Sequence, residues 1–226
     1  MSKIKRLLAP KFWKVPKKQA KFVVAPRPGP HKKFESIPLQ IVLRDILKLA
    51  ETGKEARTII KRGEILVDGK IRKDHAYSIG LFDSITIPKI KKFYRVVPTA
   101  KGLGLMGIPE NESKLKICKI NNKTILKKGK LQLNLHDGRN LLAEKDIYKN
   151  GDSILIEFPN KIVKHVKYEP NNLVIVIKGK NSGKTGKIKS IEAKKTICEM
   201  DRSTFELRKD QLAIIGKDKP LISVSR

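Results

Sequence analysis

Basic residues between positions 52 and 87 have the types and spacing for one kind of chemistry, the binding of phosphate groups. At about 100° per residue, a helix that starts after Thr52 would place Lys54, Arg57 and Lys61 within roughly 60° of one another. A solvated face is the alternative interpretation for an isolated helix. Lysine and arginine at such density position phosphates, so RNA contact is favoured over that alternative. Further cations follow directly in a predicted hairpin, namely Lys70, Arg72 and Lys73.

Local signals define the elements that must carry these cations. Thr52 can cap the helix through its hydroxyl, and the Glu55 carboxylate can accept a hydrogen bond from the Thr52 N–H. Gly63 can take the left-handed conformation that follows a helix end. Asp68-Gly69 accepts the positive φ angles of a two-residue hairpin turn. A preceding helix over 38–50 is predicted to pack on the core. Its apolar residues at helical spacing are Leu39, Val42, Leu43, Ile46, Leu47 and Ala50.

The sequence contains no comparable motif for catalysis, metal binding or nucleotide binding. Asp68, Asp137 and Asp152 are explained as turn residues, and the four histidines complete no metal-ligand spacing. Gly183-Lys184-Thr185 lacks the glycine five places earlier that a phosphate loop needs, and a strand rather than a helix is predicted after it. The sequence therefore predicts no enzyme, no metal, no cofactor and no small-molecule substrate.

The composition points to a polyanionic partner. Lys and Arg number 51 against 22 Asp and Glu, a formal net charge of +29 over 226 residues. No apolar run approaches the roughly 20 residues that span a bilayer, and no secretory signal opens the chain. The two cysteines, Cys118 and Cys198, lie far apart and are expected to be buried, unpaired strand residues. We therefore expect an intracellular protein with no membrane partner.

The first 36 residues form a segment of their own. They combine eleven basic residues with one acidic residue, five prolines and interleaved aromatics. Such a composition is expected to form no core and to become ordered only against a partner. Two roles for the aromatics stay open: stacking on unpaired bases, or docking onto the protein's own domains. The segment is predicted to be an extended basic arm.

Residues 37–98 are predicted to be a small α/β module, and the rest of the chain is predicted to be β-rich. Residues 99–115 contain clustered glycines and are expected to form a linker or long loop at the start of a middle β-domain over 99–170. Alternating runs such as 131–135, with a turn at Asp137-Gly138, predict a barrel or curled sheet there. In the last domain, over 171–226, a glycine-rich basic loop over 178–186 separates two strands. The fold class expected is therefore α+β and multidomain.

Several stretches resemble known RNA-binding families. The helix and hairpin over 52–87 resemble the module named after bacterial ribosomal protein S-four, and residues 172–191 resemble the KOW motif of ribosomal and elongation proteins. The order of parts is similar to the archaeal and eukaryotic type of small-subunit ribosomal protein four, with the shorter archaeal C-terminus. One departure is Ile177-Lys178, where that family usually has a smaller, glycine-containing pair. The pieces carrying this resemblance are Lys5-Arg6-Leu7, Ala9-Pro10-Lys11, Pro26 to His31, Val67 to Lys70, His136 to Arg139 and Asn172 to Ile188.

The resemblance implies a structural constituent of the small ribosomal subunit, located in the cytoplasm, with small-subunit rRNA and other ribosomal proteins as partners. The alternative is an RNA-modifying or ribosome-rescue factor with the same module, and a transcription-elongation protein is a third interpretation. The residues expected to contact RNA are Lys3, Lys5, Arg6, Lys11, Trp13, Lys14, Arg27, His31, Lys32, Lys54, Arg57, Lys61, Arg62, Lys70, Arg72, Lys73, Arg139, Lys180 and Lys184.

Overall fold

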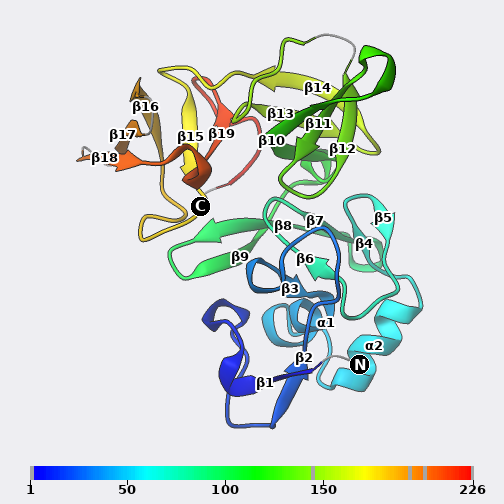
Figure 1. Ribbon diagram of the computed structural model, residues 1–226. Coiled ribbons are helices and arrows are strands. Elements are labelled where there is room, and N and C mark those ends of the chain that lie inside the picture. The colour runs from blue at the N-terminus through cyan, green and yellow to red at the C-terminus, as the bar shows by residue number, and fades with distance from the viewer. Residues whose placement is uncertain (1–2, 144–145, 193–194, 201–202, 225–226) are drawn as a thin grey trace. The chain divides into compact units, whose positions relative to one another are not determined.

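The computed structural model describes residues 3–143, 146–192, 195–200 and 203–224. The chain divides into two compact units, the first formed by residues 1–97 and 101–114 and the second by residues 98–100 and 115–226. Strands dominate both units, and short helices occur in the first (Figure 1). The predicted α+β class is confirmed. Among the helices of the described ranges, none is long and apolar enough to cross a membrane.

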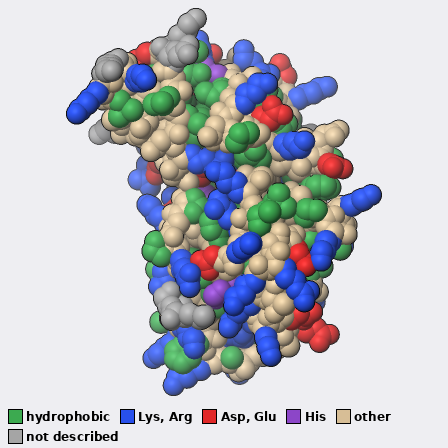
Figure 2. Space-filling model, turned by 90° about the vertical axis from the view of Figure 1, so that its right-hand side faces the viewer, with side chains coloured by type: hydrophobic (Ala, Val, Ile, Leu, Met, Phe, Trp, Pro, Cys, Tyr) green, Lys and Arg blue, Asp and Glu red, His purple; other side chains and the backbone are tan. Residues whose placement is uncertain are grey.

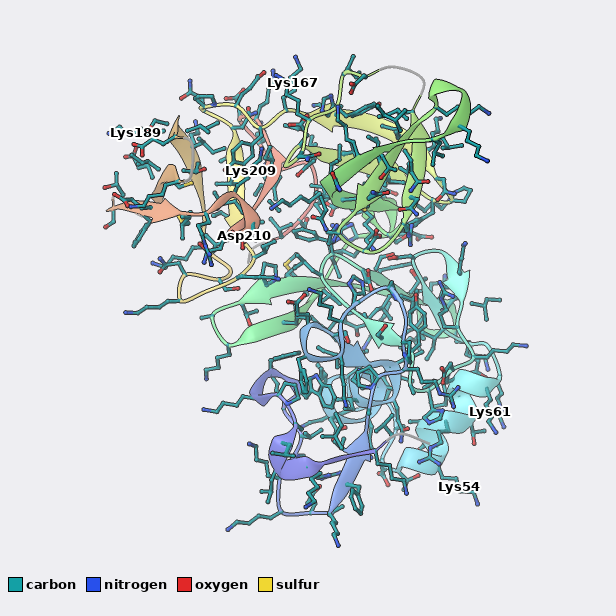
Figure 3. All side chains as sticks on the ribbon, viewed as in Figure 1. Lys54, Lys61, Lys167, Lys189, Lys209 and Asp210 are labelled. Carbon is teal, nitrogen blue, oxygen red and sulfur yellow. The ribbon has the colours of Figure 1, made fainter. Side chains whose placement is uncertain are left out.

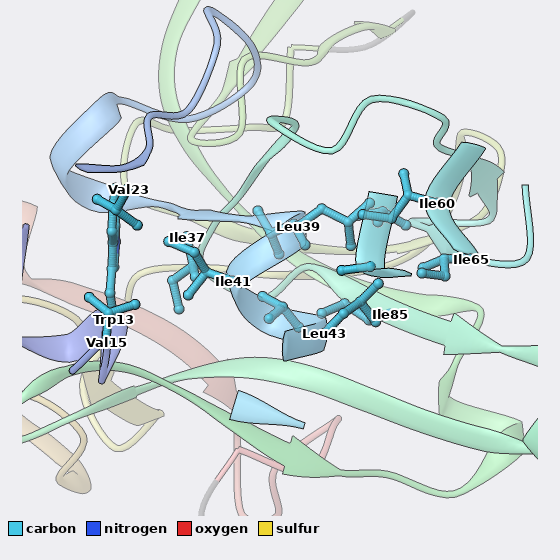
Figure 4. Packing of buried hydrophobic residues seen from close by; sticks show 14 of the residues in the cluster. Trp13, Val15, Val23, Ile37, Leu39, Ile41, Leu43, Ile60, Ile65 and Ile85 are labelled. Atoms are coloured by element: carbon cyan, nitrogen blue, oxygen red, sulfur yellow. The ribbon is translucent and has the colours of Figure 1, made fainter. Parts of the chain in front are cut away.

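The N-terminal segment packs on the first unit instead of remaining extended. Strand β1 (Lys3–Lys5) pairs antiparallel with β2 (Phe22–Val24). Trp13 is fully buried, and its indole Nε1 donates a hydrogen bond to the Ser36 carbonyl at 2.8 Å. Figure 4 shows Trp13 between Val15 and Val23 at one end of a core that continues through residues 37–96. The segment was predicted to be extended and to become ordered only against a partner; instead, apolar residues spaced among its lysines pack into the core of the first unit.

Two helical segments follow. Helix α1 (Leu39–Ile41) runs into a π-helical turn over Val42–Ile46, after a short pairing of β3 (Ile37–Pro38) with β6 (Ser78–Ile79). The predicted helix over 38–50 therefore ends early, and Lys48 takes a left-handed φ of 52°. Helix α2 (Gly53–Lys61) begins at Thr52, whose hydroxyl accepts the Glu55 N–H at 3.2 Å. The Glu55 carboxylate accepts the N–H of Glu51 at 2.9 Å, and not that of Thr52 as predicted.

A five-stranded sheet accompanies these helices, in the order β5-β4-β7-β8-β9. Its strands are β4 (Leu66–Val67), β5 (Lys70–Ile71), β7 (Ser84–Ile87), β8 (Lys92–Thr99) and β9 (Gly102–Gly107). Asp68 and Gly69 form the tight turn between β4 and β5 with φ angles of 51° and 72°, which confirms the predicted hairpin. Residues 102–107 of the linker expected over 99–115 instead form strand β9, which extends this sheet.

The second unit contains two antiparallel five-stranded sheets. The first has the order β12-β11-β10-β13-β14. Its long strand β10 pairs with β13 through residues 115–119 and with β11 through residues 120–125, with a register shift between Ile120 and Asn122. Bulges of this kind bend a strand and increase its twist. The strands are β10 (Leu115–Ile125), β11 (Leu131–Leu135), β12 (Asn140–Ala143), β13 (Ser153–Glu157) and β14 (Lys161–Val166).

The second sheet of this unit has the order β18-β17-β16-β15-β19. Val174, Ile188, Cys198 and Ile214 form part of its aliphatic core. Cys118 and Cys198 are buried strand residues, and neither forms a disulfide within the described residues, as predicted. The strands are β15 (Leu173–Val176), β16 (Thr185–Ile191), β17 (Thr196–Met200), β18 (Ser203–Leu207) and β19 (Leu212–Gly216).

Candidate nucleic-acid interface

Helix α2 presents a basic face to solvent. Ala56 and Ile60 are fully buried in the core of the first unit, while Lys54 and Lys61 are exposed. Figure 3 shows both lysines on α2 with their side chains directed away from the module. The i, i+3 and i+4 spacing fixes this division, because residues three and four apart share one side of a helix. Arg57 is half-buried, and its Nε donates to Gln40 Oε1 at 3.4 Å.

The β4–β5 hairpin adds cations to the same module. Asp68 is buried, and its Oδ1 accepts the Ser84 N–H at 2.9 Å, which anchors the turn to β7. Lys70 on β5 is exposed. The Arg72 guanidinium lies over the Tyr77 ring, with its Cζ 4.3 Å from the ring centroid. An arginine plane held on an aromatic ring has fewer conformations to lose when it meets a phosphate.

Most of the predicted contact residues of the first unit have exposed or half-buried side chains. Lys3, Lys5 and Arg27 are exposed in the N-terminal segment, as are the other lysines of that set. Lys and Arg side chains recur across the face shown in Figure 2, with few Asp and Glu between them. The exposed members of the prediction are Lys3, Lys5, Lys11, Lys14, Arg27, Lys32, Lys54, Lys61, Arg62, Lys70 and Lys73, and the half-buried ones are Arg57 and Arg72.

Three of the predicted RNA contacts have side chains that lie largely inside the protein. Trp13 is 0% exposed, so its ring cannot stack on a base. Arg6 is 6% exposed and donates from Nη1 to the Pro16 carbonyl at 2.7 Å. The His31 side chain is 6% exposed, and its Nε2 lies 3.0 Å from Asp83 Oδ2. The open choice for the arm aromatics is thereby decided for Trp13, which docks onto the protein itself.

A small hollow brings together residues that sequence reasoning did not connect. It measures about 30 Å³ and is lined by Lys3, Arg27, Arg57 and His75 over an apolar floor. Burial lowers the pKa of His75, and the positive charge of Arg57 lowers it further. Strands β1 and β2, helix α2 and the turn before β6 each contribute to this hollow. No local signal joins residues 3, 27, 57 and 75, because the hollow depends on long-range pairing.

The second unit places its predicted contacts separately. Lys180 and Lys184 are exposed in the loop between β15 and β16, and Lys184 Nζ lies 5.4 Å from the centroid of the Phe205 ring. Gly179 and Gly183 have φ angles of 98° and 90°. A Cβ on Gly183 would lie 2.9 Å from the Pro98 carbonyl oxygen, so glycine at this position allows two backbone segments to approach closely.

One cluster of potential metal ligands in this unit contains a carboxylate that already forms a buried ion pair. Ligand atoms of Cys118, His136 and Asp137 lie within 4.8 Å of one another. The Lys116 ammonium lies 2.8 Å from Asp137 Oδ2, and both side chains are 1% exposed. The His136 Nδ1 accepts the Lys119 N–H at 3.2 Å. Arg139, a predicted RNA contact, is half-buried beside the same carboxylate at 3.3 Å. The charge of the Asp137 carboxylate is therefore compensated by Lys116 and Arg139.

Comparison with known families follows the same order of parts. The RS4NT (NUC023) domain matches residues 2–34, the S4 domain matches 37–85, the ribosomal family S4e matches 90–163 and the KOW motif matches 170–202. Small ribosomal subunit protein eS4 of Archaeoglobus fulgidus is 46% identical over 97% of each chain. The chain belongs to the ribosomal S4e family. The S4e protein of Methanocaldococcus jannaschii is 41% identical over 98% of this chain and 96% of its own length.

A solved S4e structure has the same fold. The crystal structure of the 30S ribosomal protein S4e from Thermoplasma acidophilum aligns with a TM-score of 0.71 at 31% identity, covering 81% of this chain and 96% of that chain. The family resemblance seen in the sequence is therefore confirmed. The S4 match ends at residue 85, so α2 and the β4–β5 hairpin lie inside it, as does His75 of the hollow.

Proposed function

We propose that this S4e-family chain is a structural constituent of the small ribosomal subunit in the cytoplasm, and that it binds small-subunit rRNA through its exposed lysines and arginines. The single observation that carries the proposal is the α2 face, where Lys54 and Lys61 stand exposed within a matched S4 domain. The archaeal relatives are ribosomal proteins of the small subunit. The same relationship argues against an enzyme, a rescue factor or an elongation protein.

Electrostatics supports rRNA as the principal partner. A formal charge of +29 is carried by a chain in which cations line the arm, α2 and the β4–β5 hairpin. Each phosphate that such a cation neutralises releases condensed counterions, so the affinity is expected to fall steeply with salt. Other small-subunit proteins are the further partners, and the exposed Lys180 and Lys184 of the β15–β16 loop are the residues we assign to contacts in the second unit.

Charge reversal on α2 tests the proposal. The variant Lys54→Glu/Lys61→Glu should bind small-subunit rRNA more weakly and reduce the slope of log affinity against log salt by about 1.8, which is the value for two phosphate contacts. The matched control is Lys92→Glu/Lys101→Glu, which reverses two exposed charges of the first unit outside the predicted contacts. If the α2 variant and the control variant bind rRNA with equal affinity and equal salt slope, α2 is not part of the interface. Circular dichroism of both variants checks that the fold is retained.

Sedimentation of a cell extract tests the assignment to the ribosome independently. The chain should sediment with the small subunit at one copy each and remain there after a high-salt wash. Presence on a few per cent of subunits, or ready loss at high salt, would instead indicate a transient factor.

A further inference from the structure

The hollow beside α2 combines the features of a site for one small anion. Its volume of about 30 Å³ is room for two or three waters, which suits a single phosphate group and excludes a base or a whole nucleotide. Lys3, Arg27 and Arg57 bring three positive charges to its wall. The floor is formed by Val24, Ala25 and Ala76, which keep the local dielectric low and strengthen attraction to an anion.

Backbone hydrogen bonds hold the wall in place. Lys3 is paired with Val24 in the β1–β2 register. The Arg27 N–H donates to the Ala76 carbonyl at 2.9 Å, so the end of the arm is fixed to the turn that carries His75. The His75 carbonyl accepts the Gln40 N–H at 3.0 Å. Two of the three cations therefore reach the hollow only because the arm is docked on the module.

The arginines keep donors available for a ligand. Among the residues that the structure describes, Arg57 makes one side-chain hydrogen bond, from Nε to Gln40 Oε1 at 3.4 Å. Its Nη groups are thus left for a ligand, and a guanidinium fork matches phosphate oxygens in two-point contact. Arg27 Nη1 lies 3.3 Å from Asp74 Oδ2, and this Arg27 side chain is 52% exposed. A solvent-exposed pair of this kind is weak enough for a phosphate to displace it.

We propose that this hollow binds one backbone phosphate of RNA, and that the arm residues Lys3 and Arg27 complete the site together with Arg57. The proposal rests on the proposed rRNA-binding function and adds to it a specific ligand group and a role for the docked arm. The site lies apart from Lys54 and Lys61, which do not line the hollow.

Binding at this site is coupled to a proton on His75. Burial and the charges of Arg57, Arg27 and Lys61 lower the pKa of His75, while Asp74, whose Oδ1 lies 3.7 Å from His75 Nδ1, raises it. Lys3 faces the same hollow from β1. A bound phosphate adds negative charge and offsets these cations, so the pKa of His75 rises when the site is filled. A surface lysine that only steers RNA would not produce this change.

The first experiment follows the His75 imidazole by NMR in the full chain, with inorganic phosphate as the probe and chloride at equal ionic strength as the reference. The chain has four histidines, and the variant His75→Gln assigns the signal. Phosphate should raise the pKa of His75 in the wild-type protein. The variant Arg57→Gln should abolish that rise, while the matched α2 control Lys54→Gln should retain it. The absence of any difference between phosphate and chloride would overturn the phosphate site.

The second experiment measures binding to small-subunit rRNA, which keeps the two proposals separable. Arg57→Gln should weaken binding about tenfold or more, the usual effect of losing a charge-assisted hydrogen bond, and Lys54→Gln should weaken it less. If wild-type protein binds rRNA with a steep salt dependence but His75 does not respond to phosphate or rRNA, the hollow is not a site and the rRNA-binding function stands. If wild-type protein fails to bind rRNA, the proposed function itself fails.

Discussion

The buried pair of Lys116 and Asp137 gives the sharpest test of the second unit. Both side chains are 1% exposed, and the Lys116 ammonium lies 2.8 Å from Asp137 Oδ2. The other carboxylate oxygen accepts the Arg139 N–H at 3.2 Å and so holds the turn after β11. Asp137→Asn preserves the shape of this side chain but removes its charge. Removal of one partner leaves an uncompensated buried ammonium, which destabilises by about 3–5 kcal/mol.

Hydrogen exchange of the β10 and β11 amides measures this loss where it occurs. The His136 N–H, which donates to the Lys119 carbonyl, and the Leu135 N–H, which donates to the Arg139 carbonyl, should exchange about 100-fold faster, the equivalent of roughly 3 kcal/mol. Fluorescence of Trp13, the single tryptophan, reports on the first unit and should not change. The second unit, followed by hydrogen exchange, is thus compared in the same protein with the first unit, followed by fluorescence.

Two further variants test whether the buried Lys116–Asp137 pair stabilises this sheet. Asp210→Asn removes a carboxylate that is 67% exposed and lies 3.7 Å from Arg208, so it should change stability by less than about 1 kcal/mol. Adding Lys116→Met to Asp137→Asn removes the unpaired charge and should restore much of the lost protection. If Asp137→Asn accelerates exchange no more than Asp210→Asn does, the pair is not a stabilising feature of this sheet.

Three other predictions concern the Asp137 carboxylate, the Trp13 side chain and the Gly183 backbone. Burial acts to raise the pKa of Asp137, but its cationic neighbours prevail and lower the pKa to about 2. The free energy of unfolding should therefore fall by about 2 kcal/mol as the pH drops from 4 to 2, and acid titration of the Asp137→Asn variant should lack this loss. Trp13→Ala should destabilise the first unit by about 3–5 kcal/mol in urea unfolding followed by circular dichroism, and a loss below 1 kcal/mol would contradict its place in the core. Gly183→Ala should destabilise by about 1–3 kcal/mol, and more than Gly129→Ala, because both glycines have positive φ angles but only Gly183 faces the Pro98 carbonyl; equal thermal shifts would refute the steric argument.

Local signals predicted the elements that depend on few residues. The Asp68-Gly69 turn formed as expected because its two positive φ angles are properties of those residue types. The alternating run over 131–135 became β11, with Leu131, Leu133 and Leu135 buried. The Thr52 cap was also correct, although the Glu55 carboxylate accepts a different N–H. In each case the information lay within a few positions of the element.

Long-range packing decided the features that the sequence did not predict. Glycines over 102–107 suggested a loop, but pairing with the sheet made this stretch strand β9. The π-helical turn over Val42–Ile46 ended a helix that its apolar spacing would have continued. Trp13 was assigned to RNA because it lies among lysines in a segment expected to form no core of its own, and only the structure shows the core that receives it. The hollow around His75 was missed for the same reason, since its lining residues are far apart in the sequence.

The burial of Trp13 has a consequence for the kinetics and heat of subunit assembly. Fixing one backbone residue reduces its conformational entropy, which costs about 1–2 kcal/mol of free energy. In a disordered arm, this cost would reduce the free energy of binding to the RNA. In an arm already held by β1, β2 and the core around Trp13, the same entropy cost is part of the free energy of folding. Association with rRNA should then resemble the docking of a rigid body, with a small change in heat capacity and no slow ordering phase after encounter.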